Sequence, residues 1–88
     1  MKAQQLIPLD QLLTGKHGVI RQLRGGKEFT SRVTAMGLSI GSAFEVLQNR
    51  GRGPVLVRAR GSRIALGRGE ALKILVETVA ADAASSGH

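Results

Sequence analysis

The 88-residue chain lacks cysteine altogether, which excludes disulfide bridges and metal sites built on thiolates. It is also poor in aromatic residues, because Phe29 and Phe44 are the only ones. Proteins that read single-stranded nucleic acids stack successive bases on aromatic side chains. Two isolated phenylalanines cannot provide such a platform, so the composition argues against a single-strand reader.

Long apolar runs are missing too. No stretch approaches the roughly 20 apolar residues of a membrane-spanning helix, and residues 1–8 lack the apolar core of a signal peptide. We therefore expect a cytoplasmic protein without direct membrane insertion. The length predicts one domain, at residues 1–80, and the Ala/Ser/Gly-rich tail at 81–88 is expected to be disordered.

Acidic residues are outnumbered by basic ones. Six Asp and Glu stand against 13 Lys and Arg, which gives the chain a net charge of +7. Most of the basic residues are arginine, whose guanidinium group forms fixed, bidentate contacts with carboxylates and phosphates. The charge predicts an acidic partner, which could be nucleic acid, an acidic protein surface or anionic lipid headgroups.

Twelve glycines divide the chain into short apolar stretches, which is typical of a small barrel or sandwich. Residues 17–23 predict a first strand and 27–36 a helix, because Phe29, Val33 and Met36 recur at helical spacing. Further strands are expected at 43–48, 55–60, 63–66 and 75–79, and helical turns at 9–13 and 70–74. We predict a mainly β fold, a small SH3-like five-stranded barrel with one short helix inserted after its first strand.

Residues 55–66 predict a β-hairpin. Gly61 and Ser62 form a two-residue loop with Gly first, which suits a type II′ turn and sets Arg60 opposite Arg63. In that register the aliphatic side chains of both strands share one face and the arginines share the other. A slip by one residue would mix the two sets, so the pattern specifies the register.

Four segments of the chain resemble the FeoA family. Residues 32–41 (RVTAMGLSIG) are similar to its Met/Leu-Gly-Leu pattern, and 53–66 are similar to its central hairpin. Residues 70–76 (EALKILV) resemble its closing segment, and 8–18 resemble its opening. The likeness covers about residues 6–79. The chain departs from the family where Thr and Ser dilute a helix that is usually Leu-rich, and where Gly67 replaces a residue that is often charged.

The resemblance implies a function. FeoA proteins are SH3-like cytosolic accessory factors, not enzymes, and they work with FeoB, a membrane permease that carries a GTPase domain and imports Fe(II). It therefore implies that this chain binds and regulates an FeoB-type permease. Related domains also end some metal-dependent repressors, but a repressor fragment would need a preceding DNA-binding domain.

Two features are candidates for partner binding. The first is the arginine face of the hairpin with the loop before it, which would dock on acidic groups or else serve only as a solvated face that discourages aggregation. The second is an apolar turn after the helix, which would fill a partner groove or else pack back on the helix end. The candidate residues are Arg50, Arg52, Arg58, Arg60, Arg63, Met36 and Leu38.

No cofactor, metal site or catalytic set is expected. His17 has no partner at ligand spacing, the acidic residues form no cluster, and a positively charged protein is a poor host for a dication. The serines lack a His-acid pair, and neither Gly-Arg-Gly segment is a phosphate loop. An arginine finger for the permease's GTPase has no unique candidate here.

The alternative interpretation is an RNA- or ribosome-binding small basic barrel. Residues 15–20 are similar to a strand of ribosomal barrels, and the charge agrees. The scarce aromatics and the helix at 27–36 argue against it, so no nucleic-acid partner is expected. A barrel edge could also support a homodimer.

Overall fold

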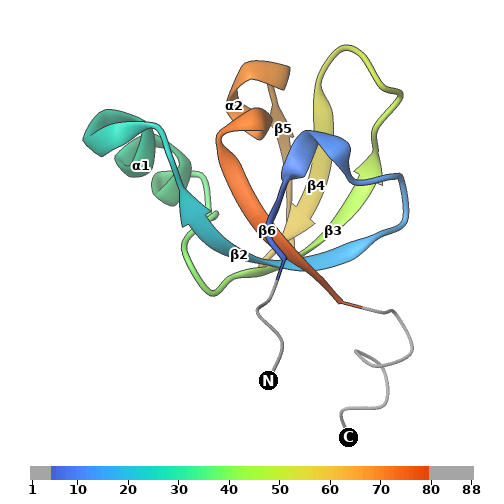
Figure 1. The fold of residues 1–88 in the computed structure, drawn as a ribbon, viewed down its shortest axis with the longest axis horizontal. Coiled ribbons are helices and arrows are strands. Elements are labelled where there is room, and N and C mark those ends of the chain that lie inside the picture. Colours follow the sequence, from blue (N-terminus) through green and yellow to red (C-terminus); the bar gives the residue numbers. More distant parts are fainter. Residues whose placement is uncertain (1–4, 80–88) are drawn as a thin grey trace, which may run out of the picture.

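The structure is a computed structural model that describes residues 5–79. Within that range six strands form one antiparallel sheet in the order β1–β6–β2–β3–β4–β5, and the sheet curls around its core (Figure 1). The strands are β1 (Ile7–Pro8), β2 (His17–Leu23), β3 (Ala43–Gln48), β4 (Val55–Ala59), β5 (Ser62–Leu66) and β6 (Ile74–Val79). The helices are the 3-10 turn η1 (Leu9–Gln11), α1 (Gly26–Ala35) and α2 (Arg68–Leu72).

The mainly β, SH3-like class expected from the sequence is confirmed, and the predicted helix after the first long strand is α1, which has ten residues and follows β2 directly. The strand that was not predicted is β1, whose two residues pair with β6. A two-residue strand carries no alternation, so no pattern could reveal it. The tail expected at 81–88 lies outside the described residues.

The core is built from the apolar alternation of the strands. Phe44 and Val46 in β3, and Val55, Val57 and Ala59 in β4, are buried, while the residues between them are partly or fully exposed. Because side chains alternate between the two faces of a strand, this pattern directs one face of each strand into the barrel. Leu9 and Leu12, on and just after η1, join the same cluster.

The end of α1 explains how a helix rich in Thr and Ser is kept in place. Gly37 has a φ of 109°, which only glycine adopts without strain. Its N–H donates to Thr34 O (3.0 Å), and the N–H of Leu38 donates to Val33 O (2.9 Å). This is the Schellman arrangement, with both Val33 and Leu38 fully buried. Tertiary burial therefore stabilises the helix where its propensity is weak.

The β4–β5 hairpin forms as predicted, but the predicted turn is wrong by one residue. The loop is Arg60 and Gly61, with φ of 54° and 79°, and Ala59 pairs with Ser62. Two consecutive residues with positive φ indicate a type I′ turn, whose twist suits a hairpin. Arginine is unusual in the first position of a type I′ turn, so the sequence did not indicate this turn. The pairing shifts by two residues, and because two is the side-chain period, the apolar and arginine faces keep their predicted sides.

One polar cluster ties the loop before β4 to the rest of the barrel. Asn49 donates from Nδ2 to the carbonyl oxygens of Asp10 (2.9 Å) and Leu12 (2.6 Å). Its Oδ1 accepts from Arg68 Nη2 (2.6 Å), and Arg68 Nη1 donates to Gly53 O (2.7 Å). η1, the loop at residues 49–54 and α2 are thus joined through two side chains.

We expect Asn49→Ala to lower the free energy of unfolding by about 2–3 kcal/mol, because two carbonyls lose their donor and Arg68 loses an acceptor. Chemical denaturation measures this change. Gln48→Ala, at the exposed neighbouring position, is the control and should change stability by less than about 0.5 kcal/mol. Equal effects of the two substitutions would contradict the role given to Asn49.

Candidate partner-binding site

A row of polar side chains crosses the outer face of the sheet. His17 in β2 pairs with Glu45 in β3, Glu45 pairs with Arg58 in β4, and Arg58 pairs with Arg63 in β5. Directly opposed residues of antiparallel strands project on the same side. Arg58 Nη1 lies 3.2 Å from Glu45 Oε1, and both side chains are partly exposed. The pair contributes about 0.5 kcal/mol at such a site, but it neutralises the charge of Arg58 locally.

Arg60 and Arg63 keep their charge free. Both are exposed, and neither takes part in an ion pair among residues 5–79, where the carboxylates in ion pairs are Glu45, Glu70 and Glu77. Arg63 stands opposite Arg58, so two guanidinium groups share this end of the hairpin. Like charges placed opposite one another are unfavourable unless an anion bridges them. The hairpin end therefore presents cationic groups that a carboxylate would stabilise.

Arg60 occupies a conformation that costs free energy. Its φ of 54° is the left-handed region, which a residue with a side chain adopts at about 1 kcal/mol. Asn or Gly is the usual residue at this position of a type I′ turn. The chain thus holds a charged side chain at the tip of the hairpin at some expense in stability, which favours a role for that charge.

Arg50 and Arg52 form a second, separate group. They lie exposed in the loop at residues 49–54, which precedes β4, whereas the turn at 60–61 follows it. The five residues of β4 separate the two groups by about 16 Å. The structure therefore does not bring all five predicted arginines into one cluster.

In the apolar turn after α1, Leu38 lies in the core and not on the surface. Leu38 is 0% exposed and belongs to the core, so its prediction as a partner contact is wrong. The alternative, in which it packs back on the helix end, is correct. Met36 is half-buried and packs against the same core. Leu38 is excluded from contact because its burial completes the helix cap.

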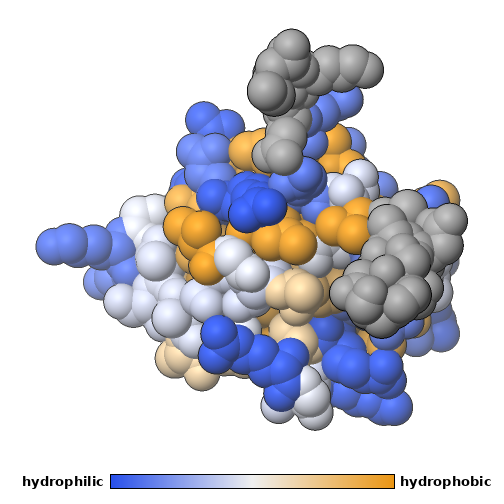
Figure 2. All heavy atoms as spheres, turned by 90° about the horizontal axis from the view of Figure 1, so that it is seen from below, coloured by the Kyte–Doolittle hydropathy of each residue, from blue (hydrophilic) through white to orange (hydrophobic). Residues whose placement is uncertain are grey.

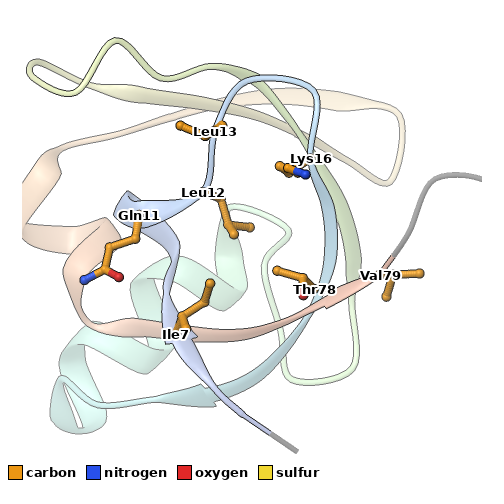
Figure 3. A pocket seen from close by; sticks show the side chains of 7 residues that line it. All are labelled: Ile7, Gln11, Leu12, Leu13, Lys16, Thr78 and Val79. Atoms are coloured by element: carbon orange, nitrogen blue, oxygen red, sulfur yellow. The ribbon is translucent and has the colours of Figure 1, made fainter.

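Exposed apolar side chains occur elsewhere, at positions that sequence reasoning did not select. Leu13 is 67% exposed, Ile40 62% and Leu72 54%. Leu13 helps line a pocket of about 460 Å³ with Ile7, Gln11, Leu12, Lys16, Thr78 and Val79 (Figure 3). Leu12 points into it, whereas Lys16 and Thr78 approach from the opposite wall (Figure 3). Figure 2, in which the barrel is seen from below the view of Figure 1, shows apolar side chains gathered between charged groups.

No group of three or more His, Asp or Glu side chains comes together within residues 5–79. No helix in this part of the chain is long and apolar enough to cross a bilayer. Both phenylalanines are buried, Phe29 on α1 and Phe44 on β3. Phe29 has the cations of Arg32 and Lys73 5.7 and 5.5 Å from its ring centre, a contact that covers the ring.

Comparison with known proteins places the chain. A family model for the FeoA domain matches residues 7–78. A candidate Fe(2+) transport protein A from Methanocaldococcus jannaschii is 38% identical over 72 residues, which cover 82% of this chain and 87% of that protein. A crystal structure of an iron uptake regulatory protein (FeoA) matches with a TM-score of 0.81 and 28% identity, over 85% of this chain and 100% of that one.

The same fold also occurs in a transcriptional repressor. A manganese-dependent transcriptional repressor matches 90% of this chain with a TM-score of 0.79, but at 20% identity. The match covers 45% of the repressor, so the two share this barrel and not their whole length.

Leu38→Ala should lower the free energy of unfolding by about 2–5 kcal/mol, because it opens a cavity in the core. Leu13→Ala removes the same atoms from an exposed site and should cost less than about 0.5 kcal/mol. Thermal or denaturant unfolding measures both. A mild effect at Leu38 would show that it is not a core residue.

Arg60→Asn should raise the free energy of unfolding by about 0.5–1 kcal/mol, since asparagine tolerates a positive φ better than arginine does. Ser62→Asn is the matched control, because Ser62 is an exposed strand residue and gains nothing from asparagine. Denaturation of the three proteins side by side tests this. Destabilisation by Arg60→Asn would mean that the arginine supports the fold.

Proposed function

The chain belongs to the FeoA domain family, and we propose that it is a non-enzymatic, cytoplasmic accessory protein of ferrous iron uptake. Its partner is an FeoB-type permease with a GTPase domain, which it binds and regulates. The family match spans nearly all of the described domain, and a relative that is 38% identical over 72 residues carries the name of an Fe(2+) transport protein. The barrel contributes a binding surface and no reaction chemistry of its own.

The observation that carries the binding proposal is that the two cations at the hairpin end, Arg60 and Arg63, have no ion-pair partner among residues 5–79. Arg60 is held at the tip in a costly conformation, and Arg63 lies beside Arg58 on the outer face. Guanidinium groups bind carboxylates through charge-assisted hydrogen bonds, which are about twice as strong as neutral ones. An acidic patch on the permease would neutralise them. Arg50 and Arg52 are too distant for the same contact and would add long-range attraction.

Regulation requires only that the barrel bind one state of the permease better than another. A ligand shifts a conformational equilibrium by its differential affinity for the two states. A preference of about tenfold corresponds to about 1.4 kcal/mol. Two or three arginine–carboxylate contacts that form in one state only would supply it.

The RNA-binding alternative has weaker support. The basic residues of the candidate site fall into two groups at opposite ends of β4, which does not trace a continuous backbone path. Both aromatic rings are buried, so neither is free to stack on a base. The positive charge and the likeness of residues 15–20 to a strand of ribosomal barrels remain in its favour.

The test is the double variant Arg60→Glu with Arg63→Glu in the full-length protein. We expect it to keep the wild-type fold, because both side chains are exposed, and to lose co-purification with the permease. Fe(II) uptake by cells that carry the variant should fall to the level of cells without the protein. Pull-down and uptake of radioactive iron measure the two effects.

A control with the same change in net charge is Arg24→Glu with Lys27→Glu, two exposed residues near the start of α1. It should bind and transport as the wild type does. Full activity of the hairpin variant would remove the arginines from the mechanism. Equal loss in both variants would mean that net charge, not the hairpin surface, attracts the permease.

A further inference from the structure

The two edges of the sheet differ in a way that bears on binding. At one edge lies β1, which has two residues, one of them Pro8, and a proline offers no N–H. At the other edge lies β5, which has five residues, contains no proline and pairs with β4 without a bulge. Among residues 5–79, β5 has β4 as its sole strand partner. The β5 edge is therefore the one that can accept another strand.

The turn determines which backbone groups face outward from β5. In a hairpin with a two-residue loop, the residues that flank the loop exchange hydrogen bonds, and bonded pairs then alternate along the strands. Because Ala59 and Ser62 flank the loop, Ser62, Ile64 and Leu66 bond to β4. Arg63 and Ala65 turn their N–H and C=O groups away from it. No backbone bond joins these groups to another element of the described chain.

The next residue of β5's alternation whose backbone groups would face outward is Gly67, and the open edge ends there. The N–H of Gly67 donates to Glu70 Oε1 (3.1 Å), and its carbonyl accepts from Ala71 N (2.9 Å). α2 therefore closes the edge on one side and the turn at Arg60 closes it on the other. Between them lie the unpaired groups of two residues, enough to bind a short extended segment.

The positive charge around this edge favours an acidic strand over a second copy of this protein as the binding partner. Arg63 lies on β5 itself and Arg60 lies in the adjoining turn, and both are exposed without an ion pair in the described chain. A second copy of this protein would bring the same arginines with it, in a molecule of net charge +7. Repulsion opposes that pairing. Carboxylates on the incoming strand would instead meet these cations.

We propose that an extended acidic segment of the partner protein adds to the sheet at β5 as a further strand. Its main chain hydrogen-bonds to Arg63 and Ala65, and its acidic side chains contact Arg60 and Arg63. This is strand addition at an exposed sheet edge, in which main-chain bonds supply affinity and side chains supply specificity. That the partner is the permease rests on the function proposed above; the strand addition rests on the geometry of β5.

The decisive variant is Ala65→Pro in the full-length protein. It removes one N–H from the open edge and leaves the bonds between β4 and β5 in place, because Ala65 does not donate to β4 and its side chain is exposed. Ala65→Thr is the matched control, since it keeps the N–H and suits a strand. Binding to the cytoplasmic part of an FeoB-type permease should weaken at least tenfold for Ala65→Pro and less than twofold for Ala65→Thr.

A second measurement does not depend on any variant. Amide hydrogen exchange of the wild-type protein should slow at Arg63 and Ala65 when the permease's cytoplasmic part is bound, and should stay unchanged at Ile64. Wild-type affinity of Ala65→Pro, or unchanged exchange at both amides in the complex, overturns the proposal.

A synthetic ten-residue peptide of alternating Glu and Val separates this proposal from the function on which it rests. If the permease does not bind, but the peptide slows exchange at Arg63 and Ala65 while its Lys–Val counterpart does not, the edge is an acidic-strand site and the assigned partner is wrong. If the permease binds through the arginines without protecting these amides, the function stands and the strand addition fails. Protection by neither probe also refutes the edge site.

Discussion

The turn at Arg60 and Gly61 sets the register on which the outer surface of the barrel depends. Its two positive φ values join β4 to β5 so that Ala59 meets Ser62. From that pairing follow the burial of the aliphatic side chains, the alignment of Arg58 with Arg63, and the outward direction of the main chain at Arg63 and Ala65. A loop longer by one residue would reverse the faces of β5 and expose its aliphatic side chains. One tight turn thus specifies both the core face and the outer face on which binding is proposed.

The positions of the charged side chains say more about their roles in this protein than the net charge does. Arg58 is matched by Glu45, and Arg68 is tied to Asn49 and to backbone carbonyls, so these arginines serve the fold. Arg60 and Arg63 lack such partners in the described chain. Net charge alone predicts an acidic partner of any kind, whereas the distribution of the charges favours one end of one hairpin as the proposed binding surface.

Much of the fold was predictable because its signals are local. The period-2 alternation in residues 55–66 and the Gly at position 37 each specify a structure through steric rules that need no distant partner. β1 and the Asn49–Arg68 cluster could not be predicted, because each is defined by partners 15 to 69 residues away in the chain. The turn was misplaced for a different reason. Arg60 adopts a backbone conformation that residues with a side chain disfavour. Turn propensities therefore do not predict an arginine at this position.

Part of the candidate site was also within reach of the sequence. The alternation placed Arg58 and Arg63 on the outer face correctly, since the shift of two residues conserves the faces. It could not tell that Glu45 neutralises Arg58, because that contact depends on the pairing of β3 with β4. Nor could it identify Leu38 as core, because an apolar residue after a helix-ending glycine is equally consistent with exposure and with a cap. Burial decided between the two.

An interface at this hairpin end would be reversible, because its contacts supply little free energy of binding. The open edge offers the backbone groups of two residues, and each hydrogen bond there contributes about 1 kcal/mol net. Exposed arginine–carboxylate pairs add about 0.2–1 kcal/mol each and act mainly on the rate of association. These terms together are a few kcal/mol, and association itself costs at least about 4 kcal/mol. The hairpin end alone therefore supports a transient complex, in which arginines guide encounter and the strand edge fixes orientation. The role proposed for this protein, which is to bias the conformational states of a working permease, would need that combination, because a permanently bound partner could not respond to each change of state.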